Sequence, residues 1–165
     1  MPDRTASPLG ADLAAFLQGG VGIVAASRDT RLLASVGRAV GCRVDDDDAT
    51  RVTIFLVPSE SGVLLEDIRA SGRVAVVFSE PSSHRTVQLK GVDARERAVG
   101  ERDLEVLAAY ADALDAELAS IGFGDGYARA LIAHPPGDLV GVSFTVGEAF
   151  VQTPGPRAGA PLATP

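Results

Sequence analysis

The sequence predicts a mainly β domain with additional helices, built as an antiparallel β-barrel with the helices packed outside it. Three observations lead to this fold class. Short apolar runs of strand length recur between turn residues. Most of these runs follow one another closely, so neighbouring strands are expected to pair antiparallel. Strand–helix alternation does not repeat often enough for a doubly wound parallel sheet, and a barrel is the simplest way to bury these strands.

The first half of the chain is expected to contain a short helix, three strands and a second helix. Apolar residues recur on one face of each helix, and turn residues separate the strands. The first two strands are joined by a turn at 28–30 and are expected to form a hairpin. In chain order, the predicted helix and strands are 9–17, 21–27, 33–44 and 52–57, followed by a helix that ends at Gly72.

Capping residues indicate where these helices begin and end. Gly19-Gly20 is expected to end the first helix with a left-handed cap. A hydroxyl of Ser59 or Ser61 is expected to cap the start of the second helix, and Gly72 to end it. The buried face of the second helix is predicted to consist of Leu64, Leu65 and Ile68.

The second half of the chain is expected to add two strands, a long helix, a short helix and a final hairpin. The predicted segments are 74–78, 85–92, 101–120, 127–133, and a hairpin of 139–146 with 149–152 around Gly147. The long helix carries one apolar stripe at spacings of three and four residues. The members of this stripe are Leu104, Leu107, Ala111, Leu114, Leu118 and Ile121.

Charge and composition exclude several classes of partner. The net charge is −7, and affinity for nucleic acid relies on Lys and Arg, so no nucleic-acid partner is expected. No apolar stretch approaches the length that spans a membrane, and the first ten residues lack the apolar core of a signal peptide. The single cysteine, Cys42, cannot form an intrachain disulfide and is expected to be a small buried thiol. These features predict a cytoplasmic protein.

Acidic, histidine and glycine motifs do not indicate a metal or nucleotide site. The run Asp45-Asp46-Asp47-Asp48 lacks the alternating ligands and the glycine of a calcium loop, and is expected to be a solvated hairpin tip. His84 and His134 lie far apart, without further ligands at metal-binding spacing. The glycine-rich segment 122–126 follows a helix rather than a strand, which predicts a connector.

Two stretches and the order of the elements resemble a known family. These stretches are GRVAVVFSEPSSHRTVQLKG, from Gly72 to Gly91, and EAFVQTPGPRAGAPL, from Glu148 to Leu162. They are similar to the flavin-binding split barrels related to pyridoxamine 5′-phosphate oxidase. The resemblance implies an antiparallel split β-barrel flanked by helices. It also implies a homodimer that holds flavin mononucleotide (FMN) between the two barrels.

This resemblance divides the chain into three parts. Residues 9–152 are expected to form a single split-barrel domain. Residues 1–8 are expected to be a flexible N-terminus, and 153–165 a Pro/Gly-rich arm. The arm is either a frayed tail or an ordered segment over the partner's cofactor, with Gln152 or Arg157 in reach.

The resemblance also assigns residues to the flavin phosphate. The related oxidases use basic residues on the second strand, where this chain has Arg38. They add an Arg-Lys pair at the start of the following helix, where this chain has Val63 and Leu64. Because that pair is lost, the phosphate would depend on other donors. The remaining candidates are the helix amides, Arg38, Arg85, Ser59 and Ser61.

The flavin ring is expected near the fifth strand. Thr86 matches a position where the oxidases use a glutamine beside the isoalloxazine ring, and Lys90 lies on the same strand. The oxidases also place a tryptophan near the C-terminus, and this chain has none. We therefore expect cofactor-binding roles for Thr86, Lys90 and Gln152, but not the activity of pyridoxamine-phosphate oxidase itself.

Three functions are compatible with these residues. The first is an FMN-dependent oxidoreductase that acts on a small molecule of unknown identity, in which the flavin supplies the hydride chemistry. The second is a deazaflavin- or haem-binding protein on the same barrel, with His84 as the candidate haem ligand. The third is a dimeric binding or sensor module with little or no cofactor.

Overall fold

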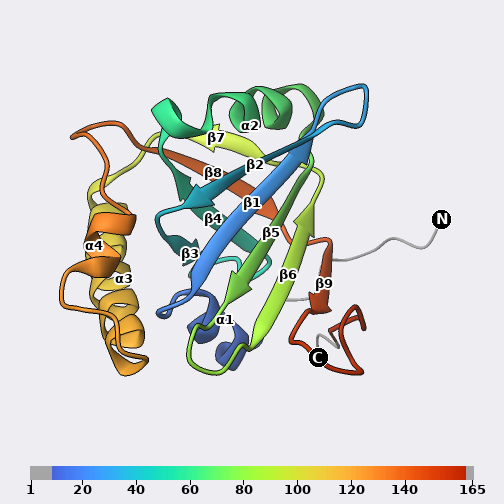
Figure 1. Ribbon diagram of the computed structural model, residues 1–165. Helices are drawn as coiled ribbons and strands as arrows, with labels where there is room; N and C mark the ends of the chain where they lie inside the picture. The colour runs from blue at the N-terminus through green and yellow to red at the C-terminus, as the bar shows by residue number, and fades with distance from the viewer. Residues whose placement is uncertain (1–8, 163–165) are drawn as a thin grey trace.

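The computed structural model describes residues 9–162 and contains two antiparallel sheets that close into one barrel (Figure 1). Sheet A has the strand order β2-β1-β5-β6-β9, and sheet B has the order β3-β4-β8-β7. The strands are β1 Gly22–Arg28, β2 Ala34–Ala39, β3 Cys42–Val44, β4 Arg51–Leu56, β5 Val74–Ser79, β6 Thr86–Gly91, β7 Arg95–Arg97, β8 Val140–Thr145 and β9 Glu148–Val151. The helices are α1 Ala11–Leu17, α2 Pro58–Ser71, α3 Glu101–Ser120 and α4 Tyr127–Leu131. The predicted antiparallel barrel with helices outside is confirmed.

The barrel closes where the chain bends from sheet A into sheet B. The predicted second strand, 33–44, is two strands, β2 and β3, separated by a corner at Val40-Gly41. At this corner Val40 N donates to Phe55 O at 2.8 Å, and Phe55 N donates to Gly41 O at 3.1 Å. A Cβ atom on Gly41 would lie 2.5 Å from Leu107 Cδ2 of α3, so the corner requires glycine.

The second corner corrects the predicted C-terminal hairpin. β8 and β9 do not pair with each other, because β8 pairs with β4 and β7 whereas β9 pairs with β6. Between them Val146 N donates to Thr50 O at 2.8 Å, and Gly147 N donates to Lys90 O at 2.9 Å. Gly147 therefore marks a change of sheet, which alternating hydrophobicity alone cannot distinguish from a hairpin turn.

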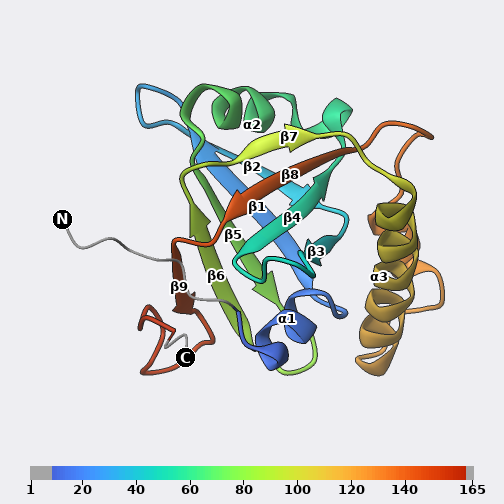
Figure 2. The same cartoon turned by 180° about the vertical axis from the view of Figure 1, so that it is seen from behind.

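Alternating strand residues fill the barrel. Ile23 and Ala25 of β1 are fully buried, whereas Val24 between them is 39% exposed. Figures 1 and 2 show α2 across one end of the barrel and α1 near the other. The predicted buried face of α2 is confirmed, since its leucines and isoleucine are 1% exposed. The largest fully buried side chains are Tyr110, Phe55, Phe78, Phe144, Leu17, Ile23, Ile54, Leu56, Leu64, Leu65, Ile68 and Leu89.

The predicted bounds of α3 are confirmed, but its buried face differs from the predicted stripe. Leu104 is 53% exposed and Ile121 is 44% exposed, whereas Tyr110 is 2% exposed. The Tyr110 hydroxyl donates to Val21 O at 2.7 Å. A Cβ atom on Gly20 would lie 2.4 Å from Ala113 O, so this glycine allows the helix to approach the barrel closely. Tyr110 can be buried because its hydroxyl is satisfied there.

Two of the predicted helix caps are wrong and one is confirmed. α1 ends at Gln18, whose φ of −99° is not left-handed. α2 follows Val57 without a side-chain cap and has Pro58 in its first turn, where the fixed φ of proline already suits a helix. Gly72 ends α2 in the left-handed region, at φ 65°.

Several other segments lie at the ends of the sheets. The acidic run forms the predicted tip of the β3–β4 hairpin, where Asp45 and Asp48 accept backbone N–H bonds from within the turn. The short charged strand β7 was not predicted. The segment after β9 folds back on its own chain, because Val151 N donates to Ala160 O at 2.9 Å and Leu162 N to Ala149 O at 2.8 Å. The predicted flexible segment 1–8 lies outside the described residues.

Candidate functional site

No helix in the described part of the chain lies across the outer face of sheet A (Figure 1). Its exposed apolar side chains include Val24 on β1 and Val36 on β2, which are 39% and 63% exposed. The register places Val24 opposite Val77 of β5, so valines and alanines form the middle of this face. The predicted site residues on the strands lie around this apolar centre.

Arg38 and Lys90 lie on this face but on different strands. Arg38 of β2 is opposite Val24, and Lys90 of β6 is opposite Ala75 of β5. Three strand spacings separate β2 from β6 in the sheet, which is about 14 Å. The Lys90 ammonium lies 4.9 Å from the centre of the Phe150 ring, a cation–π distance. Within one chain, these two cations therefore do not contact the same small group.

Thr86 and Gln152 are brought together by the pairing of β6 with the end of β9. Gln152 N donates to Thr86 O at 2.8 Å, and Gln152 Nε2 donates to Gln88 Oε1 at 3.4 Å. The Thr86 hydroxyl lies 2.8 Å from Ser79 Oγ and donates to His84 O at 2.9 Å. The sequence did not single out Gln88, although its position two residues after Thr86 places both on the same strand face.

Arg85 does not join this group. Its guanidinium lies 4.2 Å from the centre of the Phe16 ring of α1. Because successive side chains of an extended segment point to opposite sides, Arg85 points toward α1 while Thr86 points outward. His84, the candidate haem ligand, precedes it in the left-handed region at φ 61°. The structure thus separates Arg85 from Thr86 and Lys90.

A cavity of about 420 Å³ opens where α2 begins beside β2. Ser59 and Ser61 line it, and Ser61 is 4% exposed with a non-helical φ of −122°. Ser61 Oγ lies 3.1 Å from the position of a Cβ atom on Gly37, so β2 approaches the helix closely here. Glu60 also lines the cavity, and the Ser59 hydroxyl donates to Asp138. The two serines therefore lie together, but Ser59 already has a partner.

The positions of the missing basic pair differ in environment. Val63 is 67% exposed at the surface of α2, whereas Leu64 is 1% exposed. Leu64 Cδ2 lies 2.9 Å from the position of a Cβ atom on Gly37, so it packs on the β2 backbone. Leu64 is a core residue here and Val63 offers no charge, so neither can bind a phosphate.

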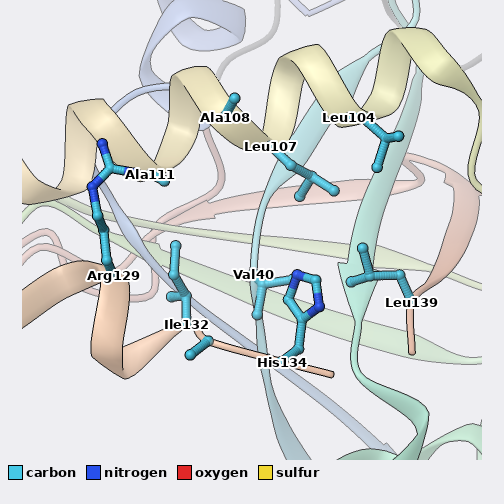
Figure 3. Close-up of a pocket in the computed structure, with 10 residues that line it drawn as sticks. Val40, Leu104, Leu107, Ala108, Ala111, Arg129, Ile132, His134 and Leu139 are labelled. Carbon is cyan, nitrogen blue, oxygen red and sulfur yellow. The ribbon is translucent and has the colours of Figure 1, made fainter. Parts of the chain in front are cut away.

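Figure 3 shows a second hollow, of about 400 Å³, between α3 and the segment after α4. Leu104 and Leu107 point toward His134 and Leu139 across it. The wall is mainly aliphatic, and Arg129 at its edge is paired with Asp112. None of the predicted site residues lines this hollow. Its walls come from segments far apart in the sequence, so spacing along the chain could not indicate it.

Cys42 is 1% exposed inside the barrel, which confirms the predicted buried thiol. Burial raises the pKa of the Cys42 thiol, because a thiolate would lose its hydration there. The group therefore stays protonated and is a poor nucleophile. No helix among residues 9–162 is long and apolar enough to cross a membrane.

Solved structures share this fold at low sequence identity. A candidate pyridoxamine 5′-phosphate oxidase from Lactobacillus delbrueckii is 15% identical, with a TM-score of 0.53 over 87% of this chain and 94% of its own. An F420 reductase is 14% identical, with a TM-score of 0.53 over 82% of this chain and 93% of its own. A pyridoxamine 5′-phosphate oxidase-related, FMN-binding protein from Nostoc punctiforme is 11% identical, with a TM-score of 0.51 over 93% and 88%.

These likenesses confirm the expected split-barrel fold. No protein-family model matches the sequence, and no curated protein matches it. At 11–15% identity, the solved structures establish the path of the chain rather than its activity.

Proposed function

We propose that this split barrel is an FMN-dependent oxidoreductase that acts on a small molecule as a homodimer. The observation that carries this proposal is the uncovered outer face of sheet A, which has Arg38 toward one edge and Thr86 with Gln152 toward the other. A ligand on this face has a wall on one side only. Small-molecule sites usually bury most of the ligand, so a second copy is the natural source of the other wall.

The exposed valines of sheet A support self-association. Val24 and Val36 would be covered if two such faces packed together. The β2 edge of one copy would then lie opposite the β6–β9 edge of the other. In that arrangement, Arg38 of one copy and Thr86 of the second would reach the same ligand.

The phosphate group of FMN fits part of the α2 cavity. The first amides of a helix usually attract anions. In α2, Pro58 has no N–H and Glu60 N already donates to Val57 O at 3.0 Å, so the Ser59 amide and the Ser61 hydroxyl are the candidate donors. The Glu60 carboxylate and the engaged Ser59 hydroxyl are unfavourable for a dianion. We therefore assign the phosphate to the Ser61 hydroxyl and the Ser59 amide, with the Ser59 hydroxyl in a secondary role and with Arg38 of β2 supplying positive charge from outside the cavity.

The flavin would supply hydride transfer, and this chain would bind and orient it. Thr86, Gln88 and Gln152 offer hydroxyl and amide groups suited to ring carbonyl and imide atoms. The apolar centre of sheet A would exclude water from one side of the ring. We place the enzyme in the cytoplasm, where a free thiol such as Cys42 stays reduced.

The visible spectrum of freshly purified protein tests this proposal, together with mass spectrometry of whatever denaturation releases. We expect a flavin spectrum and release of FMN, or saturable binding when FMN is added. A colourless protein that shows no saturable binding of flavin would refute the proposal and favour a binding or sensor module.

The phosphate assignment has its own test in the difference between FMN and riboflavin, which lacks the phosphate. Arg38→Gln should weaken binding of FMN at least tenfold and leave riboflavin binding nearly unchanged. Arg95→Gln, at an exposed position on β7 of the other sheet, is the matched control and should change neither. Equal losses for both flavins in Arg38→Gln would place the phosphate elsewhere.

A deazaflavin is the second candidate cofactor, because one structure with this fold is an F420 reductase. The exposed Val63 at a position where the oxidases have a basic residue is compatible with a different cofactor. The same release experiment separates the candidates, since F420 differs from FMN in mass and absorption. A haem spectrum that is lost in His84→Ala would instead support the haem alternative.

A further inference from the structure

A hollow of about 410 Å³ lies on sheet A where β1 ends and β5 begins, and it is rich in cations. Arg28 is the last residue of β1, Arg73 directly precedes β5, and Lys90 lies on β6. The floor consists of small apolar side chains, Ala26, Ala34 and Ala75. A volume of this size suits a small ligand.

The two arginines lie at adjoining ends of neighbouring strands. The register of β1 with β5 ends at Ala26 and Ala75, and the same alignment continued by two residues brings Arg28 beside Arg73. Both line the hollow whose floor includes Ala26 and Ala75. Like charges held close together repel each other. Arg28 Nη1 donates to Asp29 O at 3.4 Å, and its charge contributes to lowering the pKa of Asp29. Among residues 9–162, neither arginine forms an ion pair within 4.0 Å.

The backbone at Arg73 is held in place. The preceding Gly72 adopts φ 65°, and a Cβ atom there would lie 2.8 Å from Val92 O. Ser27, 9% exposed, donates its hydroxyl proton to Arg73 O at 2.7 Å. Arg73 N donates to Ser71 Oγ at 3.1 Å. The arginine thus leaves a fixed point of the backbone, which lowers the entropic cost of binding a ligand.

One carboxylate lines the hollow, and a second lies in the adjoining turn. Glu148 of β9 lines it, is opposite Lys90 in the register and offsets part of its charge. Asp29, next to Arg28, accepts bonds from Leu33 N and from Arg31, and these bonds together with the Arg28 charge lower its pKa and keep it ionised. The cations still outnumber the carboxylates that line the hollow, in a chain whose net charge is −7. A local excess of cations in an acidic protein concentrates anions at that place.

The rim of the hollow carries an exposed apolar side chain. Leu32, at the tip of the β1–β2 hairpin, is 68% exposed and lines the hollow. Its φ of 67° is in the left-handed region, which is rare for leucine. The turn is held by Leu32 N donating to Asp29 O at 3.1 Å. The strained backbone and the apolar side chain are together consistent with contact to a ligand.

We infer that Arg28, Arg73 and Lys90 form a binding site for the phosphate or carboxylate group of a small molecule, whose apolar part lies against Leu32 and the alanine floor. The planar guanidinium groups of two facing arginines suit a tetrahedral or planar oxyanion, which would also relieve their mutual repulsion. This site stands on its own residues and does not require that the protein bind flavin.

Phenyl phosphate is a suitable probe because it combines an oxyanion with a small apolar group. We expect saturable binding by titration calorimetry at constant ionic strength, weakened at least tenfold in both Arg28→Gln and Arg73→Gln. Arg95→Gln is the matched control and should bind as the wild type does. Leu32→Ser should weaken binding of phenyl phosphate several-fold while leaving binding of inorganic phosphate unchanged.

Other outcomes would overturn this inference or identify the source of the anion. Absence of binding, or an equal loss in Arg95→Gln, would refute the site. If Arg73→Gln changed only the dimer dissociation constant, the cations would serve a second copy, and the inference would be wrong. Displacement of phenyl phosphate by FMN but not by riboflavin would support the site and identify the flavin phosphate as its oxyanion. Displacement by neither flavin would support a separate ligand.

Discussion

The two sheets of this barrel differ in how far the side chains on their outer faces are buried. On sheet B, the side chains of β4 from Val52 to Leu56 are buried on both faces of the sheet, and even the polar Thr53 and Ser143 are 5% and 9% exposed. On sheet A, Val24 and Val36 of the outer face stay exposed. Residues of the same chain therefore cover the outer face of sheet B, whereas the apolar side chains on the outer face of sheet A would be covered only by a ligand or another chain.

Sheet B is closed by a buried ion network at the start of α3. Asp103, 2% exposed, accepts two bonds from Arg97, at 2.7 and 2.9 Å, and lies 3.1 Å from Arg43. It also accepts the Gly100 N–H bond at 2.9 Å, which caps the helix. Arg97 in turn lies over the Phe55 ring at 5.6 Å. One carboxylate thus joins the helix, strand β7 and the outer face of sheet B.

The cations on sheet A are not joined to a buried carboxylate in this way. The charges of Arg28 and Arg73 face the same hollow, and Arg38 lies farther along the same sheet face. In sheet B the buried carboxylate of Asp103 neutralises the arginines. On the uncovered outer face of sheet A, we expect a ligand to supply the negative charge. This difference is the basis of the predictions that follow.

Removal of Asp103 should have the largest effect on stability. Asp103→Ala leaves Arg97 and Arg43 without their carboxylate, and breaking a buried pair costs about 3–5 kcal/mol of unfolding free energy. Denaturant unfolding monitored by circular dichroism measures this loss. The control is Asp112→Ala, an exposed aspartate of the same helix that pairs with Arg129, for which about 0–1 kcal/mol is expected. Similar losses for the two variants would mean that the network does not close sheet B.

The contribution of Asp103 should also depend on pH. Hydrogen bonding to Arg97 lowers the pKa of Asp103 below its ordinary value. A carboxyl whose folded pKa is depressed contributes stability that is fully present above the unfolded pKa of about 3.9, and this stability is lost as pH falls through the folded value. The difference in unfolding free energy between wild type and Asp103→Ala should therefore be constant from pH 5 to 7 and shrink below about pH 4. A difference that persisted unchanged in acid would show that cap geometry, not charge, provides the stability.

The contrast between the two sheets also explains what the sequence could predict. The positions of most strands and the α3 bounds followed from periodicity, which is a local property, whereas the corner inside 33–44 and the short strand β7 did not. The Asp103 network was not predicted because Arg43, Arg97 and Asp103 come from three elements, and their encounter depends on the barrel closing. The same is true of Arg28 and Arg73, which line one hollow because β1 and β5 are neighbours in sheet A. Val63 and Leu64 differ from these arginines, because the sequence alone shows that they replace the Arg-Lys pair of the oxidases.

Removal of the Tyr110 hydroxyl should have a smaller effect, because α3 is anchored at more than one place. Tyr110→Phe deletes the bond to Val21 O but keeps the ring in the core. A buried hydrogen bond of this kind contributes about 0.5–1.5 kcal/mol, so a loss of that size in thermal or denaturant unfolding is expected. Tyr127→Phe, at a residue that is 47% exposed, is the control and should change stability little. A loss above 3 kcal/mol would instead mean that the ring itself has moved.

A charge introduced on the outer face of sheet A should change the unfolding free energy of a single chain least among these variants. The same charge should clearly weaken the association of two chains. Val36→Glu changes a side chain that is 63% exposed, so the unfolding free energy of the isolated chain should change by no more than about 0.5 kcal/mol. In a dimer packed through sheet A, the same carboxylate would be buried against valines, which is strongly unfavourable.

If the wild type dimerises through sheet A as proposed, sedimentation of Val36→Glu should show monomers at concentrations where the wild type sediments as a dimer, together with weaker flavin binding. Ile121→Glu, at a residue that is 44% exposed at the end of α3, is the matched control for an added charge elsewhere. If Ile121→Glu and not Val36→Glu dissociated the dimer, the association surface would lie on α3. The exposed valines of sheet A would then have to be covered by some other ligand, because an apolar strand face in contact with water is unfavourable.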